Sequence, residues 1–408
     1  MEDTEIDIEI GEIQSKNITL GKVLSAAILK GLGTAAWRSP GKEEVHLIVS
    51  FTKIQPQYTH PNLEELQSGF LVSPYENDNN LLQYFIDADL HFVFGDSGIS
   101  SYKQDQRLSQ KKVEEFLNDV SDINTETVFQ TGFNSDYSEE EHKRENFKSL
   151  VKLSVEKIKS GEFQKVVPSR KNKIHLPDNF NLGLKYMELC NLHPQAFVSL
   201  FSLSGKDIWI GASPELLIKI TAGRFFHTSA VAGTQSGRNI QNLSEVAWTQ
   251  KEIEEQALVS RYIINNFKKI RLREFEEEGP KTVKAGELLH LRTDYKVDLE
   301  AVNFPQLGSV MLKLLHPTSA VCGMPKENAS KFLKDHENLD REFYSGYLGP
   351  VNIRAETSIY VNLRCAKIVK NKCILYAGAG VTRDSNPEKE WIETELKMST
   401  IKEVLLSE

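Results

Sequence analysis

Hydrophobic residues recur along the chain at two spacings, one typical of strands and one typical of helices. Short apolar runs bounded by turn residues predict strands; they are Val45–Phe51, Leu90–Phe94, Phe163–Ser169, Asp207–Gly211, Leu216–Ile220, Arg224–Thr228, Ser358–Ile368 and Lys372–Ala377. Helical spacing predicts helices over 23–32, from 138 to Gly161, over 244–270 and from Asn386 onward. The acidic run Glu276–Pro280 is predicted to be a solvated connection. Runs of strands between long helices favour a mixed or antiparallel sheet with helices outside.

The helix predicted over 244–270 has one broad apolar arc at about 100° per residue. Ile253 and Phe267 lie in that arc. Two carboxylates, Glu252 and Glu255, lie in it too. An ionised carboxylate on a buried face is unfavourable unless a cation or hydrogen-bond donors meet it. A Glu–Lys pair or a wrongly assigned face is the simpler explanation, and a metal ion is the other.

The last predicted helix repeats this arrangement. Asn386 is its predicted N-cap, and Pro387 occupies its first position. Glu390, Glu393 and Lys397 share one face with the apolar residues of the later turns. Mg²⁺ prefers oxygen ligands, commonly one or two carboxylates completed by substrate and water. Two helices therefore offer carboxylates of the kind that Mg²⁺ binds.

The strand predicted over Ser358–Ile368 alternates in polarity. Tyr360, Asn362 and Arg364 share one face, because successive side chains of a strand point to opposite sides. Such a face can be an outer surface, which is the simpler explanation. It can also line a carboxylate site, since a guanidinium binds two carboxylate oxygens at once.

Composition and charge exclude several classes of protein. Of the 408 residues 40% are hydrophobic and 26% are charged, as in globular proteins, and the net charge of −8 disfavours nucleic-acid and anionic-membrane binding. No apolar run approaches the length of a membrane span, and the acidic first residues do not resemble a targeting peptide. The four cysteines lack CxxC spacing, which favours free thiols. The expected compartment is the cytoplasm.

Eight motifs, all after residue 138, then form a pattern in a fixed order. They are Phe163–Arg170, Gly211–Leu217, Ser229–Thr234, Leu288–Leu291, Leu315–Gly323, Asp340–Gly346, Tyr376–Gly380 and Glu390–Lys397. This pattern resembles the chorismate-utilising enzymes, which include isochorismate, salicylate, anthranilate and aminodeoxychorismate synthases. The resemblance implies one large α+β or mixed α/β domain, with two mixed sheets packed face to face and helices outside. Residues 138–408 would be the chorismate-binding catalytic region, and residues 1–137 a weakly matching N-terminal part of the same fold.

The resemblance also implies a cofactor, Mg²⁺, and a set of site residues. The implied metal carboxylates are Glu255 and Glu393, with Glu252 and Glu390 beside them. The implied substrate-binding residues are Gly233, Thr234, His290, Ala320, Tyr344, Arg364, Tyr376, Gly378 and Lys397. Among these, Arg364 and Tyr344 would bind the enolpyruvyl carboxylate of chorismate.

Two positions distinguish the members of the family. In the resemblance, Lys165 stands where anthranilate synthases have glutamine, and Ala232 stands where aminodeoxychorismate synthase has lysine. In the resemblance Lys165 is the base that activates water, and Glu215 is the acid that protonates the departing C4 hydroxyl. An exposed strand lysine and a turn-capping carboxylate are the structural alternatives for these two residues.

The expected activity is that of an isochorismate synthase, which adds water at C2 of chorismate and releases the C4 hydroxyl. A salicylate synthase, which also eliminates pyruvate, is the alternative that Tyr344 keeps open and Ala320 disfavours. A non-catalytic chorismate-binding regulator is a third possibility, although it would need no acid–base pair. The product would enter menaquinone or siderophore biosynthesis. Expected partners are chorismate and isochorismate, with no nucleic acid or membrane, and the chain is expected to be a monomer, with a dimer as the alternative.

Overall fold

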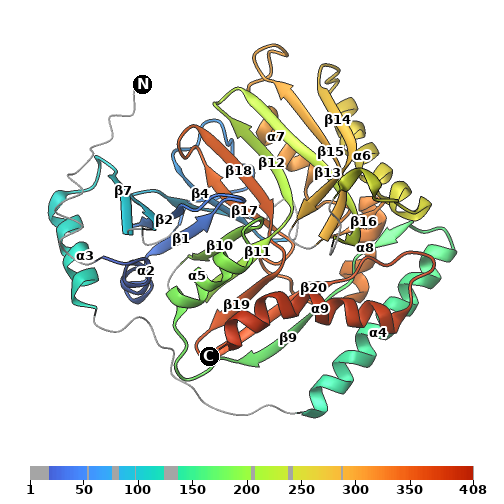
Figure 1. Ribbon diagram of the computed structural model, residues 1–408, viewed down its shortest axis with the longest axis horizontal. Coiled ribbons are helices and arrows are strands. Elements are labelled where there is room, and N and C mark those ends of the chain that lie inside the picture. Colours follow the sequence, from blue (N-terminus) through green and yellow to red (C-terminus); the bar gives the residue numbers. More distant parts are fainter. Residues whose placement is uncertain are drawn as a thin grey trace.

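The computed structural model describes residues 18–52, 55–75, 82–96, 98–123, 137–203, 207–237, 242–285 and 288–407. Two nine-stranded sheets pack face to face within this part of the chain, and helices cover their outer faces (Figure 1). Neighbouring strands in both sheets are antiparallel. The expected architecture of two packed sheets with outer helices in one domain is confirmed.

The strands of the first sheet are, in spatial order, β7 (Gly98–Gln104), β6 (Leu90–Gly95), β2 (Val45–Ser50), β1 (Gly33–Arg38), β10 (Phe197–Ser202), β11 (Asp207–Ser213), β19 (Cys365–Val369), β20 (Lys372–Gly378) and β9 (Ser169–His175). Those of the second sheet are β14 (Glu276–Ala285), β15 (Leu288–Asp298), β13 (Phe225–Ser236), β12 (Leu216–Thr221), β18 (Glu356–Val361), β17 (Tyr347–Val351), β4 (Gly69–Ser73), β5 (Gln83–Asp87) and β3 (Gln57–Tyr58). A separate small ladder pairs β8 (Lys165–Val166) with β16 (Gly323–Met324). The N-terminal third contributes to both sheets, because β1 pairs with β10 and β4 pairs with β17.

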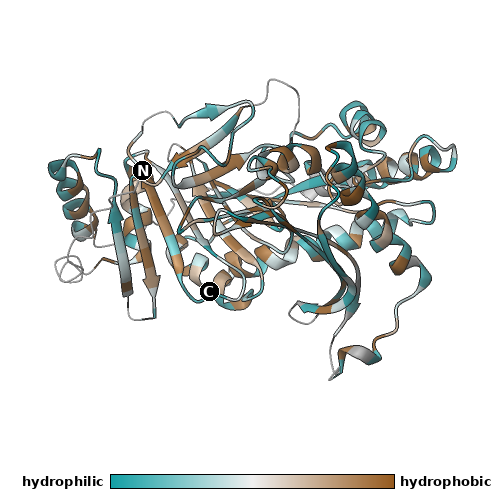
Figure 2. Ribbon diagram, turned by 90° about the horizontal axis from the view of Figure 1, so that it is seen from above, coloured by the Kyte–Doolittle hydropathy of each residue, from teal (hydrophilic) through white to brown (hydrophobic). Residues whose placement is uncertain are grey.

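The hydrophobic core has layers. Between the sheets lie mainly aromatic residues, with Phe197 of β10 stacked on Tyr360 of β18 at 4.0 Å between ring centres. The first sheet buries its outer face against α2 (Leu20–Leu29), α3 (Gln110–Asp122), α5 (Leu182–Leu192) and α9 (Pro387–Leu406). The second sheet packs against α6 (Gln250–Lys269) and α7 (Leu307–Leu315), while α4 (Tyr137–Lys159) and α8 (Lys326–His336) enclose a fourth cluster with β8. In Figure 2 the hydrophobic positions gather on the central strands.

The chain crosses between the sheets at two neighbouring places. From β11 in the first sheet it passes to β12 in the second, and from β18 in the second it passes to β19 in the first. The crossings are bonded to each other: Ala212 N donates to Arg364 O at 3.0 Å, and Val361 N donates to Glu215 O at 3.0 Å. Glu215 and Arg364 therefore occupy adjacent crossings in the middle of the molecule.

Three sequence predictions about elements were wrong. The single strand Ser358–Ile368 is two strands in different sheets, because Arg364 has a φ of 47° and turns the chain there. The run Glu276–Pro280 is not a loop but the start of β14, an exposed edge strand. Of the strand predicted over Phe163–Ser169, only a two-residue strand forms before β9 begins.

Two predictions from composition can be compared with the structure. The four cysteines are buried free thiols, as their spacing predicted. Within the described ranges no helix combines the length and apolar character that a membrane crossing requires.

Candidate active site

Lys165 and Glu255 form an ion pair in the structure. Lys165 lies in β8, and its side chain is 17% exposed. Its Nζ lies 3.2 Å from Oε1 of Glu255, so the predicted base and one predicted metal carboxylate are direct partners. Gly380 adjoins the lysine, because a Cβ added at Gly380 would lie 3.2 Å from Lys165 Cε. The helix α6 thus turns Glu255 toward the site, whereas Ile253, predicted for the same apolar arc, is 45% exposed.

Glu215 is held at its crossing by hydrogen bonds on both its backbone and its side chain. Its carboxylate oxygen Oε1 accepts a hydrogen bond from Thr318 Oγ1 at 3.1 Å. Burial raises the pKa of this carboxyl, and the Thr318 hydrogen bond and the nearby Lys165 charge offset only part of that rise. A raised pKa suits a general acid, which must be protonated at the working pH.

Arg364 presents a guanidinium that makes no hydrogen bond or ion pair within the described part of the chain. Burial lowers the pKa of Arg364, while Tyr344 and Glu393 raise it, so these two groups lie near the guanidinium. A partly buried guanidinium without an internal partner is suited to a ligand carboxylate, which it can bind through two parallel hydrogen bonds.

Lys397 and Glu393 form a second lysine–carboxylate pair on α9. Lys397 Nζ lies 2.6 Å from Glu393 Oε1 and donates to the carbonyl of Gly378 at 2.9 Å. Burial lowers the pKa of Lys397; Glu393 raises it, and the charges of Arg364 and Lys165 lower it further. Lys165 and Arg364 are therefore near enough to the Lys397–Glu393 pair for their charges to act on the pKa of Lys397.

Two stacked tyrosines support the wall of this site. Tyr344 is buried, and a Cβ added at Gly378 would lie 3.1 Å from its hydroxyl. Its ring stacks on Tyr376 with 5.4 Å between centroids. Tyr376 donates its hydroxyl to Glu342 at 3.0 Å, so that hydroxyl already has a partner. Of the two rings, Tyr344 is the one whose hydroxyl reaches the predicted site.

The backbone around Gly233 lies near the N-terminal end of α6. Gly233 has a φ of 70°, and its carbonyl lies 2.9 Å from His290 Nδ1; because a carbonyl only accepts, this nitrogen donates. A Cβ added at Gly233 would lie 3.2 Å from the ring of Trp248, so little space remains there. Thr234 follows in β13, and its side chain lies outside the described residues.

The three remaining predicted residues have different surroundings. Glu252 completes the N-terminal capping box of α6, since its Oε2 accepts from Thr249 N at 2.8 Å, and it also accepts from Gln235 Nε2 at 2.9 Å. This carboxylate is engaged one turn before Glu255. Glu390 is buried in the first turn of α9. Ala320 is exposed, two residues beyond Thr318.

The donor set is suited to Mg²⁺ only in part. Glu255 and Glu393 come from two helices, and each is paired with a lysine of the site. Among the described residues no group of three His, Cys, Asp or Glu side chains is arranged to hold a metal ion. Mg²⁺ commonly binds through one or two carboxylates and completes its six ligands with water and substrate. Two carboxylates are the number of protein ligands that this pattern needs, and in this structure a lysine engages each of them.

Sequence reasoning did not assign a role to Thr318 or to Gly380. Thr318 is separated from Glu215 by 103 residues, so no local pattern could pair them. Both residues lie inside motifs that were recognised, Leu315–Gly323 and Tyr376–Gly380. Membership in those motifs was the sequence feature that could have identified them as site residues.

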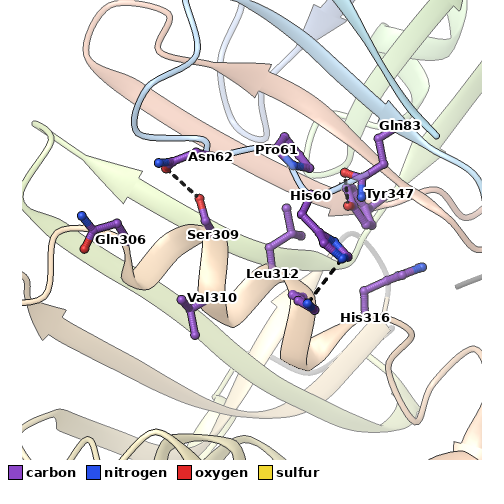
Figure 3. A pocket seen from close by; sticks show the side chains of 11 residues that line it. His60, Pro61, Asn62, Gln83, Gln306, Ser309, Val310, Leu312, His316 and Tyr347 are labelled. Atoms are coloured by element: carbon purple, nitrogen blue, oxygen red, sulfur yellow. Dashed lines mark hydrogen bonds between the residues drawn. The ribbon is translucent and has the colours of Figure 1, made fainter. Parts of the chain in front are cut away.

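A separate pocket is lined by residues of α7 and of the N-terminal third. It has a volume of about 270 Å³ and lies between α7 and the chain around His60, with Gln83, His316 and Tyr347 along its wall (Figure 3). Lys313 Nζ lies 3.4 Å from His60 Nε2 at its rim. None of the predicted site residues lines this pocket.

The chain belongs to a family of chorismate-binding enzymes: the family model described as "Chorismate binding enzyme" matches residues 96–406. The chain is similar to isochorismate synthase MenF of Escherichia coli (strain K12), with 29% identity over 64% of this chain and 60% of that protein. It is 28% identical to the vibriobactin-specific isochorismate synthase of Vibrio cholerae over 63% of this chain and 66% of that protein. These matches span less than two thirds of the two curated relatives.

Solved structures show the same fold. The structure of MenF from Escherichia coli aligns with a TM-score of 0.75 at 22% identity, covering 99% of this chain and 94% of that one. Anthranilate synthase component I from Streptococcus pneumoniae aligns with a TM-score of 0.64 at 18% identity, covering 90% and 89%. The family and fold expected from the motifs are therefore confirmed.

Proposed function

We propose that the protein is an isochorismate synthase, which interconverts chorismate and isochorismate with Mg²⁺ as cofactor. The observation that carries the proposal is the pair formed by Lys165 and Glu215. One is an amine and the other a carboxyl whose pKa burial raises, and they are near enough for the lysine charge to act on that pKa. Two observations support this activity. The relatives include isochorismate synthases, and position 165 is a lysine where the resemblance gives anthranilate synthases a glutamine.

The reaction needs a base and an acid. Lys165, acting as the base, takes a proton from water while the water oxygen bonds to C2 of the ring. Both ring double bonds then shift by one position, and the C4–oxygen bond breaks. Glu215, in its protonated form, donates to that departing oxygen, which leaves as water. One water is consumed and one is released, so the conversion is a balanced isomerisation.

The substrate carries two carboxylates, and the site offers a separate partner for each. Mg²⁺ held by Glu255 and Glu393 would fix the ring carboxylate and offset its charge. Arg364, whose guanidinium has no partner in the described chain, would bind the enolpyruvyl carboxylate beside Tyr344. Lys397 is held by Glu393 and by the Gly378 carbonyl.

The experiment is a product analysis. Purified protein is incubated with chorismate and Mg²⁺, with and without ammonium, and the mixture is separated by chromatography. We expect a mixture of chorismate and isochorismate, the same with ammonium, and little pyruvate. Anthranilate in the ammonium sample would contradict the role of Lys165, and an unchanged substrate would contradict the proposed activity.

A salicylate synthase is the second candidate, and Tyr344 favours it. Elimination of pyruvate from isochorismate requires a firm hold on the enolpyruvyl group, and we assign that hold to Tyr344 and Arg364, which are near enough for Tyr344 to act on the Arg364 pKa. Stoichiometric salicylate and pyruvate in the same experiment would establish this activity instead.

A further inference from the structure

We infer that the buried ion pair Arg341–Glu337 positions the base and the acid relative to each other. The two residues touch neither Lys165 nor Glu215 directly. They hold two chain segments. One carries Lys165, and the other carries Thr318, the hydrogen-bond partner of Glu215. The inference rests on the proposed function, because it takes Lys165 and Glu215 as the acting groups.

The pair is almost completely withdrawn from solvent. The Arg341 side chain is 1% exposed and that of Glu337 is 5% exposed. Arg341 donates from Nε to Glu337 Oε1 and from Nη2 to Glu337 Oε2, both at 2.6 Å. The guanidinium also lies 4.2 Å above the ring of Tyr75. Two parallel hydrogen bonds and a stacked ring fix the plane of the guanidinium.

The other hydrogen bonds of the pair go to the backbones of two segments. Arg341 Nη2 donates to Val167 O at 2.8 Å, and Nη1 donates to Val321 O at 2.8 Å. Glu337 Oε2 accepts from Ser169 N at 2.9 Å. Val167 and Ser169 belong to the segment that begins with Lys165 in β8. Val321 belongs to the segment that carries Thr318.

These contacts connect the pair with both catalytic groups. Val167 is two residues beyond Lys165 in the sequence. Val321 is three residues beyond Thr318, whose hydroxyl bonds Glu215 at 3.1 Å. A rotation or shift of the guanidinium would therefore change the position of Lys165 relative to Thr318 and its hydrogen bond to Glu215.

A purely stabilising role explains the pair less well. Replacing a buried ion pair by apolar residues of similar volume is often neutral for stability or favourable, because taking charges out of water is costly. Apolar residues lack the planar guanidinium, which donates to four acceptor atoms at once. The geometry therefore indicates a role in alignment, where displacements of about 1 Å can lower kcat by roughly 100-fold.

The test compares Arg341→Lys with a matched variant, Arg38→Lys. Arg38 is also buried, and it also donates to backbone carbonyls, those of Pro194 at 2.8 Å and Ala196 at 3.1 Å, but its contacts include no predicted site residue. For both variants and the wild type, Tm, kcat and KM for chorismate with Mg²⁺ are measured well below every Tm. Amide hydrogen exchange is followed over 165–169 and 318–322.

We expect Arg341→Lys to lower kcat by roughly 10–100-fold while KM changes less than about threefold, because substrate contacts remain. Exchange over both segments should be faster by about tenfold or more. Arg38→Lys should lower Tm and leave kcat and both exchange rates near the wild-type values. If Arg341→Lys does not fold, the double variant Arg341→Met with Glu337→Met serves instead, with the same expected loss of kcat at a retained Tm.

Equal kcat losses in the Arg341 and Arg38 variants at equal losses of Tm would overturn the inference, as would a folded double variant with full activity. If the wild type forms no isochorismate, the proposed function fails, but the exchange comparison still decides whether the pair aligns the two segments. Unchanged exchange over 165–169 and 318–322 in Arg341→Lys then contradicts it.

Discussion

The hydrogen bond from Thr318 to Glu215 affects the pKa of the Glu215 carboxyl. It lowers the pKa of Glu215, against the larger rise caused by burial. Thr318→Val removes the hydrogen bond, so the pKa should rise further and the acid should remain protonated to higher pH. We therefore expect the alkaline limb of the kcat–pH profile to move to higher pH in this variant.

The matched control for this shift is Thr357→Val. Thr357 is buried, and its hydroxyl bonds Asn352 at 3.2 Å, away from the predicted site. Its pH profile should coincide with that of the wild type. An alkaline limb in Thr318→Val that stays in place, or moves to lower pH, would contradict the assignment of Glu215 as the acid.

The acid and the base should each dominate turnover. Lys165→Ala removes the amine and Glu215→Gln removes the transferable proton, so we expect each variant to lose roughly 10²–10⁴ in kcat with its fold retained. Circular dichroism and Tm check the fold, and initial rates give kcat. Lys219→Ala, which removes a strand lysine paired with Glu356 at 3.1 Å, is the control and should leave kcat unchanged. Near-normal turnover of either catalytic variant would exclude that residue from the mechanism.

How far single residues could be predicted from the sequence depended on whether their signal was local. Lys165 and Glu215 were found through motifs, and the apolar arc of α6 directed attention to Glu255. The environment of Arg364 was not predictable from the sequence. Alternation of side chains between two faces holds only within a continuous strand, and the positive φ at Arg364 ends the strand there. The pairing of Thr318 with Glu215 depends on the tertiary fold alone.

At the scale of elements, two helices carry the carboxylates proposed to hold Mg²⁺. Chelation by EDTA should abolish activity, Mg²⁺ should restore it, and Glu393→Ala should not regain activity at ordinary Mg²⁺ concentrations. The Tm should change little on chelation, because the core is built from the two sheets and their helices. Activity assays with metal titration measure the first effect and thermal unfolding the second.

The control for the metal prediction is Glu395→Ala on the same helix. Glu395 pairs with Arg170, and its loss should leave the Mg²⁺ dependence of the rate unchanged. Full activity of the wild-type protein in excess EDTA would end the metal hypothesis. Recovery of Glu393→Ala at the wild-type Mg²⁺ concentration would remove Glu393 from the ligand set.

Elements with local end signals were predicted well, and elements defined by pairing were not. The start of α9 is confirmed, since the Asn386 side chain accepts from Glu388 N at 2.9 Å and caps the helix. In contrast, β14 begins with three glutamates and lies at the edge of the second sheet, where charged residues are tolerated. Such a strand has the composition of a loop, so only its pairing with β15 reveals it.

At the scale of the whole molecule, the two sheets place Glu215 and Arg364 at neighbouring crossings. One crossing joins β11 to β12 and the other joins β18 to β19, and these two consecutive pairs of strands come from distant parts of the sequence. The N-terminal strands complete both sheets through partners more than 100 residues away, such as Ala36 with Leu200. The sequence predicted strands in this region but not their partners, because buried apolar runs carry no record of what they pair with.

The central claim is that water attacks C2 while the C4 hydroxyl leaves, and its most direct test is the origin of the product hydroxyl. Chorismate is converted in H₂¹⁸O with Mg²⁺, and the isochorismate is examined by mass spectrometry after a short incubation, with a chelated sample as control. We expect isochorismate that carries one ¹⁸O, and chorismate that gains the label later through the reverse reaction. Unlabelled isochorismate would mean that the hydroxyl moves within the substrate and would contradict the roles given to Lys165 and Glu215.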